Sequence, residues 1–224
     1  MMIRPRALIA ALTLALLVPV AASAQTVAAS TAQAAPAPRP PITPIRPDDR
    51  TLGSAEAPVT LTVYLSTTCS HCADWHNNSF PAIRAKYVDT GLVRVVYRDL
   101  PTAPREVAFS GAVMARCVPA EHYDDALHSL YRGQAALRSE TQEELDLKVV
   151  DWLAAAGAAG GLTTEQMRTC LTDGANRNVL DARIAASRSD GVRGTPTFFI
   201  NGAEAEIWDV ESLDAVVQPL LTAN

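Results

Sequence analysis

Two cysteines stand at the junction between a predicted strand and a predicted helix. Residues 59–65 have the sequence Val-Thr-Leu-Thr-Val-Tyr-Leu, an alternating, β-branched pattern that predicts a strand. The motif Cys-Ser-His-Cys follows at residues 69–72, and residues 73–87 have a helical pattern with a kink expected at Pro81. A Cys-x-x-Cys pair between a strand and a helix is typical of redox-active dithiols. The junction therefore favours an α/β fold with a dithiol at the start of a helix.

The two cysteines are expected to differ because of their places on this helix. Cys69 lies at the helix N-terminus, where free backbone N–H groups and the positive end of the helix dipole favour a thiolate. Cys72 lies one turn further along, which predicts a sheltered sulfur. We therefore expect Cys69 to attack and be attacked, and Cys72 to be the resolving cysteine.

A helix terminus alone does not explain a strongly acidic thiol. Redox-active thiols have pKa values of about 3.5 to 7.5, against about 8.5 for free cysteine. This difference requires roughly 1.4–7 kcal/mol of thiolate stabilisation, whereas a helix terminus supplies at most about 2 kcal/mol. An imidazolium at His71, between the cysteines, is expected to supply more. Because a stabilised thiolate makes the disulfide a stronger oxidant, His71 favours disulfide donation.

Zinc binding, haem attachment and a structural disulfide are the alternatives for this motif. His76 is near, but the other two cysteines lie far away in predicted helices, so a zinc site is not expected. Ala73 follows the second cysteine, where covalent haem attachment requires histidine. A disulfide within one helical turn would constrain little. We expect neither a metal nor an organic cofactor.

The rest of the chain predicts a helical segment inserted into a sheet. A second, buried strand is expected at residues 92–97, parallel to the first. Helices are expected around residues 107–118 and 123–131, after capping boxes at Thr141 and Thr163, and up to Gly191. Strands are then expected at residues 197–200 and 205–208, joined by an Asn-Gly turn at 201–202, before a helix at 213–221.

The sequence Gly-Thr-Pro-Thr at residues 194–197 opens the third predicted strand. A proline at the start of a buried strand is tolerated only at its first residue or at an edge. We expect a cis bond between Thr195 and Pro196, with a trans bond as the alternative. A cis bond would present the Thr195 backbone beside the dithiol, where a substrate peptide could pair with it as an added strand.

These segments together resemble the thioredoxin superfamily and, within it, the DsbA-like thiol-disulfide oxidoreductases of bacterial cell envelopes. The resemblance rests on Ala-Pro-Val-Thr at residues 57–60, the dithiol motif at 69–72, Gly-Thr-Pro-Thr at 194–197 and Asn-Gly at 201–202. It covers residues 52–221. It implies a thioredoxin fold with an inserted helical domain, a cis-proline at Pro196, a catalytic first cysteine and oxidation of exported proteins.

Three positions depart from the family pattern. Ser70 stands where the best-known members have proline, a change that can alter the redox potential. Thr195 precedes the proline in some isomerases and in some oxidases, so it does not decide the direction of exchange. Val63 lies six residues before Cys69, where the family often has a buried acid. A proton relay through a strand carboxylate is therefore not expected.

The remaining cysteines, Cys117 and Cys170, fall in predicted helices of the insertion. In an oxidising compartment we expect them to bond to each other. The chain-entropy model gives about 4 kcal/mol for closing a loop of this length. The pair resembles the second, structural disulfide of some DsbA-like proteins. A redox-regulatory role and two free thiols are the alternatives.

The N-terminal residues predict export. Residues 1–24 combine two arginines, an apolar stretch and the sequence Ala-Ser-Ala, which is typical of a cleaved signal peptide. An uncleaved anchor is the alternative, but the apolar stretch is shorter than the roughly 20 residues needed to span a bilayer. Residues 25–50, rich in Pro and Ala, are expected to form a flexible tether, with a docking segment as the alternative. Residues 51–102 and 191–224 would form the thioredoxin-like domain, and 103–190 the inserted helical domain.

Composition excludes other classes of protein. Hydrophobic residues at 48% and charged residues at 19% are those of a globular chain. A net charge of −5 gives no electrostatic footprint for nucleic acid. About 200 residues after a signal peptide suffice for one domain with a large insertion.

We therefore predict a periplasmic thiol-disulfide oxidoreductase that donates disulfides to exported proteins with free cysteines. By resemblance, a membrane protein of the DsbB type would reoxidise it. A monomer is expected, because residues 25–50 cannot form the N-terminal dimerisation domain that isomerases of the superfamily usually carry. The alternatives are an isomerase or reductase with the same site, and a peptide-binding chaperone with idle cysteines.

Overall fold

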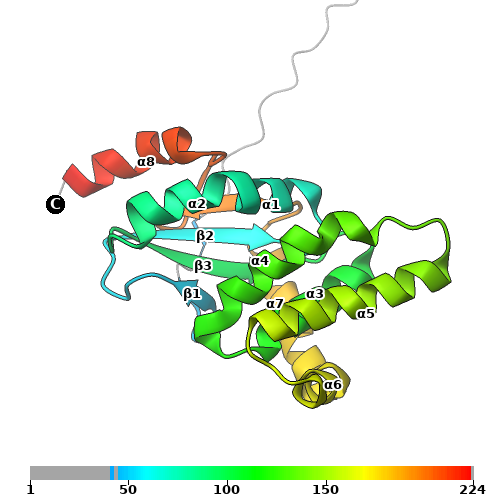
Figure 1. Ribbon diagram of the computed structural model, residues 1–224. Helices are drawn as coiled ribbons and strands as arrows, with labels where there is room; N and C mark the ends of the chain where they lie inside the picture. Colours follow the sequence, from blue (N-terminus) through cyan, green and yellow to red (C-terminus); the bar gives the residue numbers. More distant parts are fainter. Residues whose placement is uncertain (1–40, 43–44, 223–224) are drawn as a thin grey trace, which may run out of the picture. The chain divides into compact units, whose positions relative to one another are not determined.

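The described part of the chain is built on one mixed β-sheet. The computed structural model describes residues 41–42 and 45–222, and within them the strand order is β1-β3-β2-β4-β5 (Figure 1). The predicted signal peptide at residues 1–24 lies outside the described residues. β2 and β3 are parallel, and the other neighbouring pairs are antiparallel. The strands are β1 Arg50–Leu52, β2 Val59–Leu65, β3 Val93–Asp99, β4 Thr197–Ile200 and β5 Ala203–Ala205.

The parallel strands β2 and β3 form the centre of the sheet. All their side chains are buried except the half-buried Thr60 and Arg94. Such near-continuous burial is expected of parallel strands that are covered on both faces. The strand predicted at residues 59–65 is confirmed, and the one predicted at 92–97 is confirmed but extends to Asp99.

The connection from β2 to β3 is helical throughout but not uniform. Helix α1 (Ser70–Asp74) continues through a π-helical turn, Trp75–Ser79, into α2 (Phe80–Ile83) and a second π-helical turn, Arg84–Val88. Pro81 lacks an N–H, and its ring would clash with the carbonyl group of residue 77 in a regular α-helix. The disturbance expected at Pro81 therefore takes the form of a wider turn just before it.

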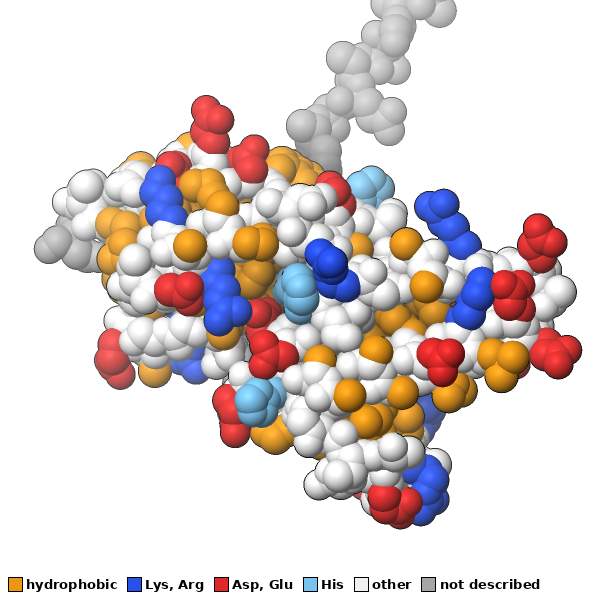
Figure 2. All heavy atoms as spheres, in the orientation of Figure 1, with side chains coloured by type: hydrophobic (Ala, Val, Ile, Leu, Met, Phe, Trp, Pro, Cys, Tyr) orange, Lys and Arg blue, Asp and Glu red, His pale blue; other side chains and the backbone are white. Residues whose placement is uncertain are grey.

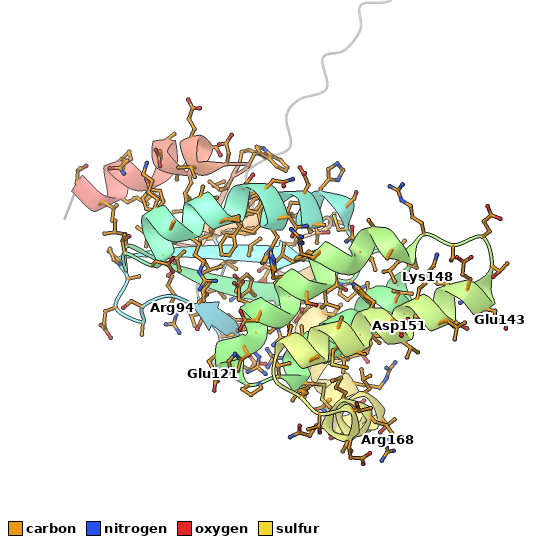
Figure 3. All side chains as sticks on the ribbon, viewed as in Figure 1. Arg94, Glu121, Glu143, Lys148, Asp151 and Arg168 are labelled. Carbon is orange, nitrogen blue, oxygen red and sulfur yellow. A yellow bond between two sulfur atoms is a disulfide. The ribbon has the colours of Figure 1, made fainter. Side chains whose placement is uncertain are left out.

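A group of helices lies between β3 and β4, inside the predicted insertion at residues 103–190. The capping predictions are confirmed, because Thr141 accepts a hydrogen bond from the Glu144 N–H and Thr163 forms a full capping box with Gln166. The exposed side of α5 and α6 carries charged residues such as Glu143, Asp151 and Arg168 (Figure 3). The helices are α3 Arg105–Cys117, α4 Tyr123–Gly133, α5 Gln142–Ala159, α6 Thr164–Thr172 and α7 Gly174–Ser189, with 3₁₀ turns at Ala120–His122 and Gln134–Leu137.

Helices cover both faces of the sheet. The C-terminal helix α8 (Val210–Thr222) contacts α2 and β2, whereas α7 contacts β3. In Figure 1, helix α4 crosses in front of the sheet, and α3 and α5 lie mostly beyond the arrowhead of β2. This arrangement confirms the predicted α/β class with an inserted helical segment. It also brings the insertion next to the loop that leaves β2.

Side chains from the sheet and from the insertion share one core. Val63 of β2 and Trp75 of the helical connection belong to the same buried cluster as Leu127 of α4 and Trp152 of α5. The indole N–H of Trp152 donates to the carbonyl oxygen of Leu130 over 2.7 Å, so this buried polar group is paired. The insertion is therefore packed onto the sheet domain through apolar contacts.

The C-terminal hairpin differs from its prediction. Asn201 and Gly202 form the turn with φ angles of 49° and 87°, as expected for an Asn-Gly turn. The partner strand β5, however, is Ala203–Ala205 and not residues 205–208, because a two-residue turn lets pairing resume at once, Ile200 with Ala203. Position 202 also requires glycine for steric reasons, because a Cβ there would lie 2.8 Å from the carbonyl oxygen of Ile42.

The last residues of the predicted tether pack against the folded domain. The side chain of Ile42 is 6% exposed and belongs to a buried cluster with Tyr64 and Phe199. Asp49 pairs with the buried guanidinium group of Arg98 over 2.9 Å. The sequence of residues 25–50 did not predict this attachment, because single apolar and acidic residues among prolines give no periodic signal.

Strand β1 was not predicted from the sequence. It contains three residues and pairs antiparallel with β3, with Arg50 opposite Tyr97. So short a segment has no detectable alternation, and its strand conformation depends on the free edge of β3. Among residues 41–42 and 45–222, no helix has the length and apolar character needed to cross a membrane.

Candidate active site

The two motif cysteines occupy different environments at the start of α1. Cys69 is the N-cap residue with extended backbone angles, φ −79° and ψ 119°, and its side chain is half-buried. Cys72 is completely buried within the core cluster. Both are free thiols in this structure. The exposed and sheltered positions predicted for these two sulfurs are therefore present.

Hydrogen bonds at the helix start lower the pKa of the Cys69 thiol to about 5, well below the usual value for a free cysteine. The largest cause is the hydrogen bond from the Cys72 side chain, which outweighs the opposing effect of burial. The Thr195 side chain and the backbone N–H groups of Cys72 and His71 add to the effect. These backbone donors have no partners inside the helix, which is why the N-terminus favours an anion.

Burial raises the pKa of the Cys72 thiol well above its ordinary value, and its hydrogen bond to Cys69 and the Cys69 charge add to this. A charged group in an apolar environment is disfavoured, and one thiolate disfavours a second one beside it. At neutral pH the pair therefore holds one thiolate, on Cys69, and one thiol, on Cys72.

His71 contributes differently from the prediction. Its side chain is exposed, and the imidazole is not among the main causes of the lowered pKa of Cys69. The backbone N–H of His71 is one of those causes. The exposed ring lies in a high dielectric, where the effect of its charge is screened. The sequence analysis attributed the stabilisation of the Cys69 thiolate to an imidazolium at His71. The largest contribution comes instead from the Cys72 side chain.

The loop before β4 lies beside Cys69. The bond between Thr195 and Pro196 is cis, and the thiol of Cys69 donates to the carbonyl oxygen of Thr195 over 3.2 Å. Antiparallel pairing of β2 with β4, with Tyr64 opposite Thr197, brings the end of one strand to the start of the other. The structure thus brings together four residues predicted for the site: Cys69, Cys72, Thr195 and Pro196.

Gln134 is a site residue that sequence reasoning missed. Its side-chain amide donates to the carbonyl oxygens of Thr67 and Cys69, over 2.9 Å and 3.1 Å. Thr67 in turn donates from its hydroxyl group to the carbonyl oxygen of Ala108 in α3, over 2.9 Å. The insertion therefore holds the loop that ends at Cys69 from two helical elements. A glutamine in a 3₁₀ turn gives no sequence signal for such a contact.

The other two cysteines form a disulfide between α3 and α6. Their Cα atoms lie 5.9 Å apart, within the usual range for a disulfide. Cys117 ends α3 and Cys170 lies within α6, so the bond joins two helices of the insertion. Among the described residues there is no group of three or more His, Cys, Asp or Glu side chains arranged to hold a metal ion.

Comparisons with known proteins agree with this fold. A Rickettsia bellii protein named "Putative protein-disulfide oxidoreductase" is 27% identical over 171 residues, which are 76% of this chain and 63% of that protein. This chain thus spans less than two thirds of that relative. The crystal structure of α-DsbA1 from Wolbachia pipientis has a TM-score of 0.70 at 23% identity, covering 80% of this chain and 94% of the other.

A second solved structure, oxidised BdbD from Bacillus subtilis, has a TM-score of 0.66 at 16% identity and covers 78% of this chain and 93% of its own. At these identities the likeness shows a shared fold, that of DsbA proteins. The family model described as thioredoxin matches residues 46–218, which include the strands β1 to β5, the dithiol and the whole insertion. The chain therefore belongs to the thioredoxin family.

Proposed function

We propose that the protein is a protein-disulfide oxidoreductase that donates disulfides to exported proteins through Cys69 and Cys72. The observation that carries this proposal is the contrast between the two thiols. The pKa of Cys69 is lowered to about 5, while that of Cys72 is raised. One sulfur is thus a thiolate that leaves and attacks readily, and its neighbour is a protected resolving thiol.

In the proposed reaction, a substrate thiolate attacks the Sγ atom of Cys69 in the disulfide form. The Cys69–Cys72 bond breaks, Cys72 leaves with the electron pair, and a substrate–Cys69 disulfide forms. A second substrate thiolate attacks the substrate sulfur of this bond, which forms the substrate disulfide and releases Cys69 as a thiolate. The backbone at Thr195 and Pro196, beside Cys69, would hold the substrate main chain as an added strand.

The direction of exchange follows from the thiolate. Stabilising Cys69 as a thiolate stabilises the reduced protein, so the oxidised protein gains a stronger tendency to pass its disulfide on. This favours donation over the isomerase and reductase alternatives. The relative from Rickettsia bellii is also named as a protein-disulfide oxidoreductase.

The setting of the reaction is part of the proposal. The signal-like residues 1–24 support export to the periplasm, where disulfides persist. Regeneration of the disulfide then requires an electron acceptor, for which we propose a membrane protein of the DsbB type. The protein would act as a monomer. It would need no metal and no organic cofactor, because the exchange needs only sulfur atoms and protons.

Equilibration with glutathione buffers tests the proposal. We expect a reduction potential well above that of thioredoxin, about −270 mV, and rapid oxidation of a reduced, unfolded model substrate. A potential at or below that value would instead support a reductase. The Cys69→Ser variant should be inactive in oxidation, and if it kept the protein's full effect on folding substrates, the chaperone alternative would be correct.

A further inference from the structure

Three arginine side chains line a small cavity that includes no residue of the dithiol site. Arg50 of β1, Arg116 of α3 and Arg183 of α7 border this cavity, whose volume is about 120 Å³. No acidic residue of the described chain lines it. On the face shown in Figure 2, by contrast, most Lys and Arg side chains lie near Asp or Glu side chains. A cavity surrounded by positive charge alone calls for an explanation, because like charges repel.

The carboxylates that pair with these arginines border a different cavity. Arg116 pairs with Asp99 over 2.5 Å, and Arg183 pairs with Asp48 over 2.7 Å. Both carboxylates line a second cavity, of about 130 Å³, which Arg116 and Arg183 also border. They therefore balance two of the three arginines without lining the first cavity.

Arg50 is the arginine without a carboxylate of its own. Among the described residues it forms no ion pair, and its Nη2 atom donates to the carbonyl oxygen of Arg116 over 2.8 Å. The guanidinium groups of Arg50 and Arg116 lie over the same Tyr123 ring, 5.9 Å and 5.7 Å from its centroid. Burial lowers the pKa of Arg50, and the charge of Arg116 lowers it further. The fold thus holds two like charges at one ring, and one of them has no counterion.

Two of the three arginines also have a buried donor without an acceptor. The Nε atoms of Arg50 and Arg183 are shielded from solvent and have no hydrogen-bond partner among the described residues. Burial lowers the pKa of Arg183, and the charge of Arg116 lowers it further, as it does for Arg50. A guanidinium group keeps its charge in proteins and carries five N–H donors. An oxyanion would therefore supply both the missing acceptors and the missing negative charge.

Most of the remaining wall of the cavity is apolar. It includes Val113 of α3 and Val179 and Leu180 of α7. Val113 and Leu180 are buried, whereas Val179 is 50% exposed and lies at the opening. Guanidinium groups next to aliphatic side chains suit a carboxylate on a short aliphatic chain better than an inorganic ion, because both parts of such a ligand find a matching wall. The volume corresponds to about four water molecules, which limits the chain to a few carbon atoms.

We propose that this cavity binds a small aliphatic carboxylate, which is held by Arg50, Arg116 and Arg183. The carboxylate accepts hydrogen bonds from the guanidinium groups, and its chain packs against Val179 and Leu180. Because the arginines come from β1, α3 and α7, the bound anion joins the edge of the sheet to two helices of the insertion. A ligand that binds only the folded protein stabilises it, so binding raises the melting temperature. The inference does not depend on exchange at the dithiol.

Thermal unfolding of the oxidised protein in the presence of sodium butyrate tests the proposal. At equal ionic strength, the effect of butyrate is compared with that of butyramide, its neutral counterpart, and of inorganic phosphate, which has the charge but not the chain. We expect saturating butyrate to raise the melting temperature by about 2–4 °C, and the other two to give no such rise. Absence of a rise with butyrate, or an equal rise with butyramide or phosphate, would overturn the proposal.

The Arg50→Gln variant should lose the rise, because it removes the charge that has no carboxylate of its own. Arg94→Gln is the matched control. Arg94 also lies in the sheet and also has a buried, unpartnered Nε atom, but it does not line this cavity. The control should keep the full rise with butyrate. Equal rises in the two variants would show that butyrate acts elsewhere and would contradict the assignment of the cavity.

A second pair of variants decides the question even if Arg50→Gln does not fold. Val179 is exposed at the opening, so Val179→Asp and Val179→Asn are both expected to fold. Only aspartate brings a carboxylate of the chain itself to the cavity. We expect Val179→Asp to melt at a higher temperature than Val179→Asn without butyrate, and to respond less to butyrate. The same melting temperature and the same butyrate response in both variants would refute the proposed anion site.

Discussion

The side-chain amide of Gln134 donates a hydrogen bond to the backbone carbonyl oxygen of Cys69 over 3.1 Å. The same nitrogen donates to Thr67, two residues earlier, over 2.9 Å. Gln134 belongs to the insertion, whereas Cys69 caps the first helix of the sheet domain. The insertion thus fixes the path of the backbone into the dithiol, and its role is not limited to covering the sheet.

Replacing Gln134 by alanine is expected to destabilise the protein by about 1–3 kcal/mol, because two carbonyl oxygens in a half-buried site lose their donor. Urea unfolding of the reduced protein measures this change. Gln142→Ala is the matched control, since the Gln142 side chain is exposed and bonds the exposed carboxylate of Asp146. Equal midpoints for the two variants would contradict a holding role for Gln134.

The acidity of Cys69 is expected to depend on Cys72 more than on His71. The rate of alkylation of Cys69 by iodoacetamide should rise with pH around an apparent pKa of about 5. Cys72→Ala removes the largest cause of that low pKa and should shift the profile to clearly higher pH, whereas His71→Ala should shift it less. A larger shift in His71→Ala would restore the imidazolium explanation.

Lowering the pH should remove a contribution to folding stability that only the reduced protein has. A folded-state pKa lowered to about 5 means that the thiolate of Cys69 stabilises the fold in full above the unfolded-state pKa of about 8.5, and that this contribution declines as the pH falls from there and is lost below about 5. The oxidised protein has no such group. Thermal unfolding of both forms between about pH 9 and pH 4 should therefore show the reduced form losing stability relative to the oxidised form as the pH falls. A constant difference between the two melting temperatures would contradict the low pKa.

The disulfide between Cys117 and Cys170 is expected to act on stability and not on exchange. Replacing both cysteines by alanine should cost about 4 kcal/mol by the chain-entropy model, measured by urea unfolding. The equilibrium of Cys69 and Cys72 with glutathione should not change. A larger change in that equilibrium would indicate that the second disulfide takes part in redox chemistry.

A side chain at position 111 is expected to destabilise the protein. A Cβ atom there would lie 2.5 Å from the Thr67 hydroxyl oxygen and 2.6 Å from the Trp152 ring. Gly111→Ala should therefore lower stability by about 1–3 kcal/mol, as overpacking does in other cores. Gly174→Ala is the control, because nothing lies within 4 Å of the added atom. Indistinguishable melting temperatures for the two variants would show that the space around Gly111 is not limiting.

Local sequence patterns predicted most of the secondary structure. The alternation in residues 59–65, the capping residues Thr141 and Thr163 and the Asn-Gly turn at 201–202 each act within a few residues, so they are visible in the chain itself. The wrong position of β5 was an error of register. It arose because the strand partner depends on the turn length and on β4, and not on the pattern of residues 205–208.

Some features of the site could likewise be predicted from local sequence, and others could not. The dithiol at a strand-to-helix junction and the Thr-Pro loop could be found from the sequence, because each is a continuous motif whose chemistry depends on its own backbone. The contact of Gln134 with Cys69 and the burial of Cys72 required the folded chain. These features join residues far apart in sequence, and hydrogen bonding and desolvation depend on the distances that packing creates, which no local pattern encodes.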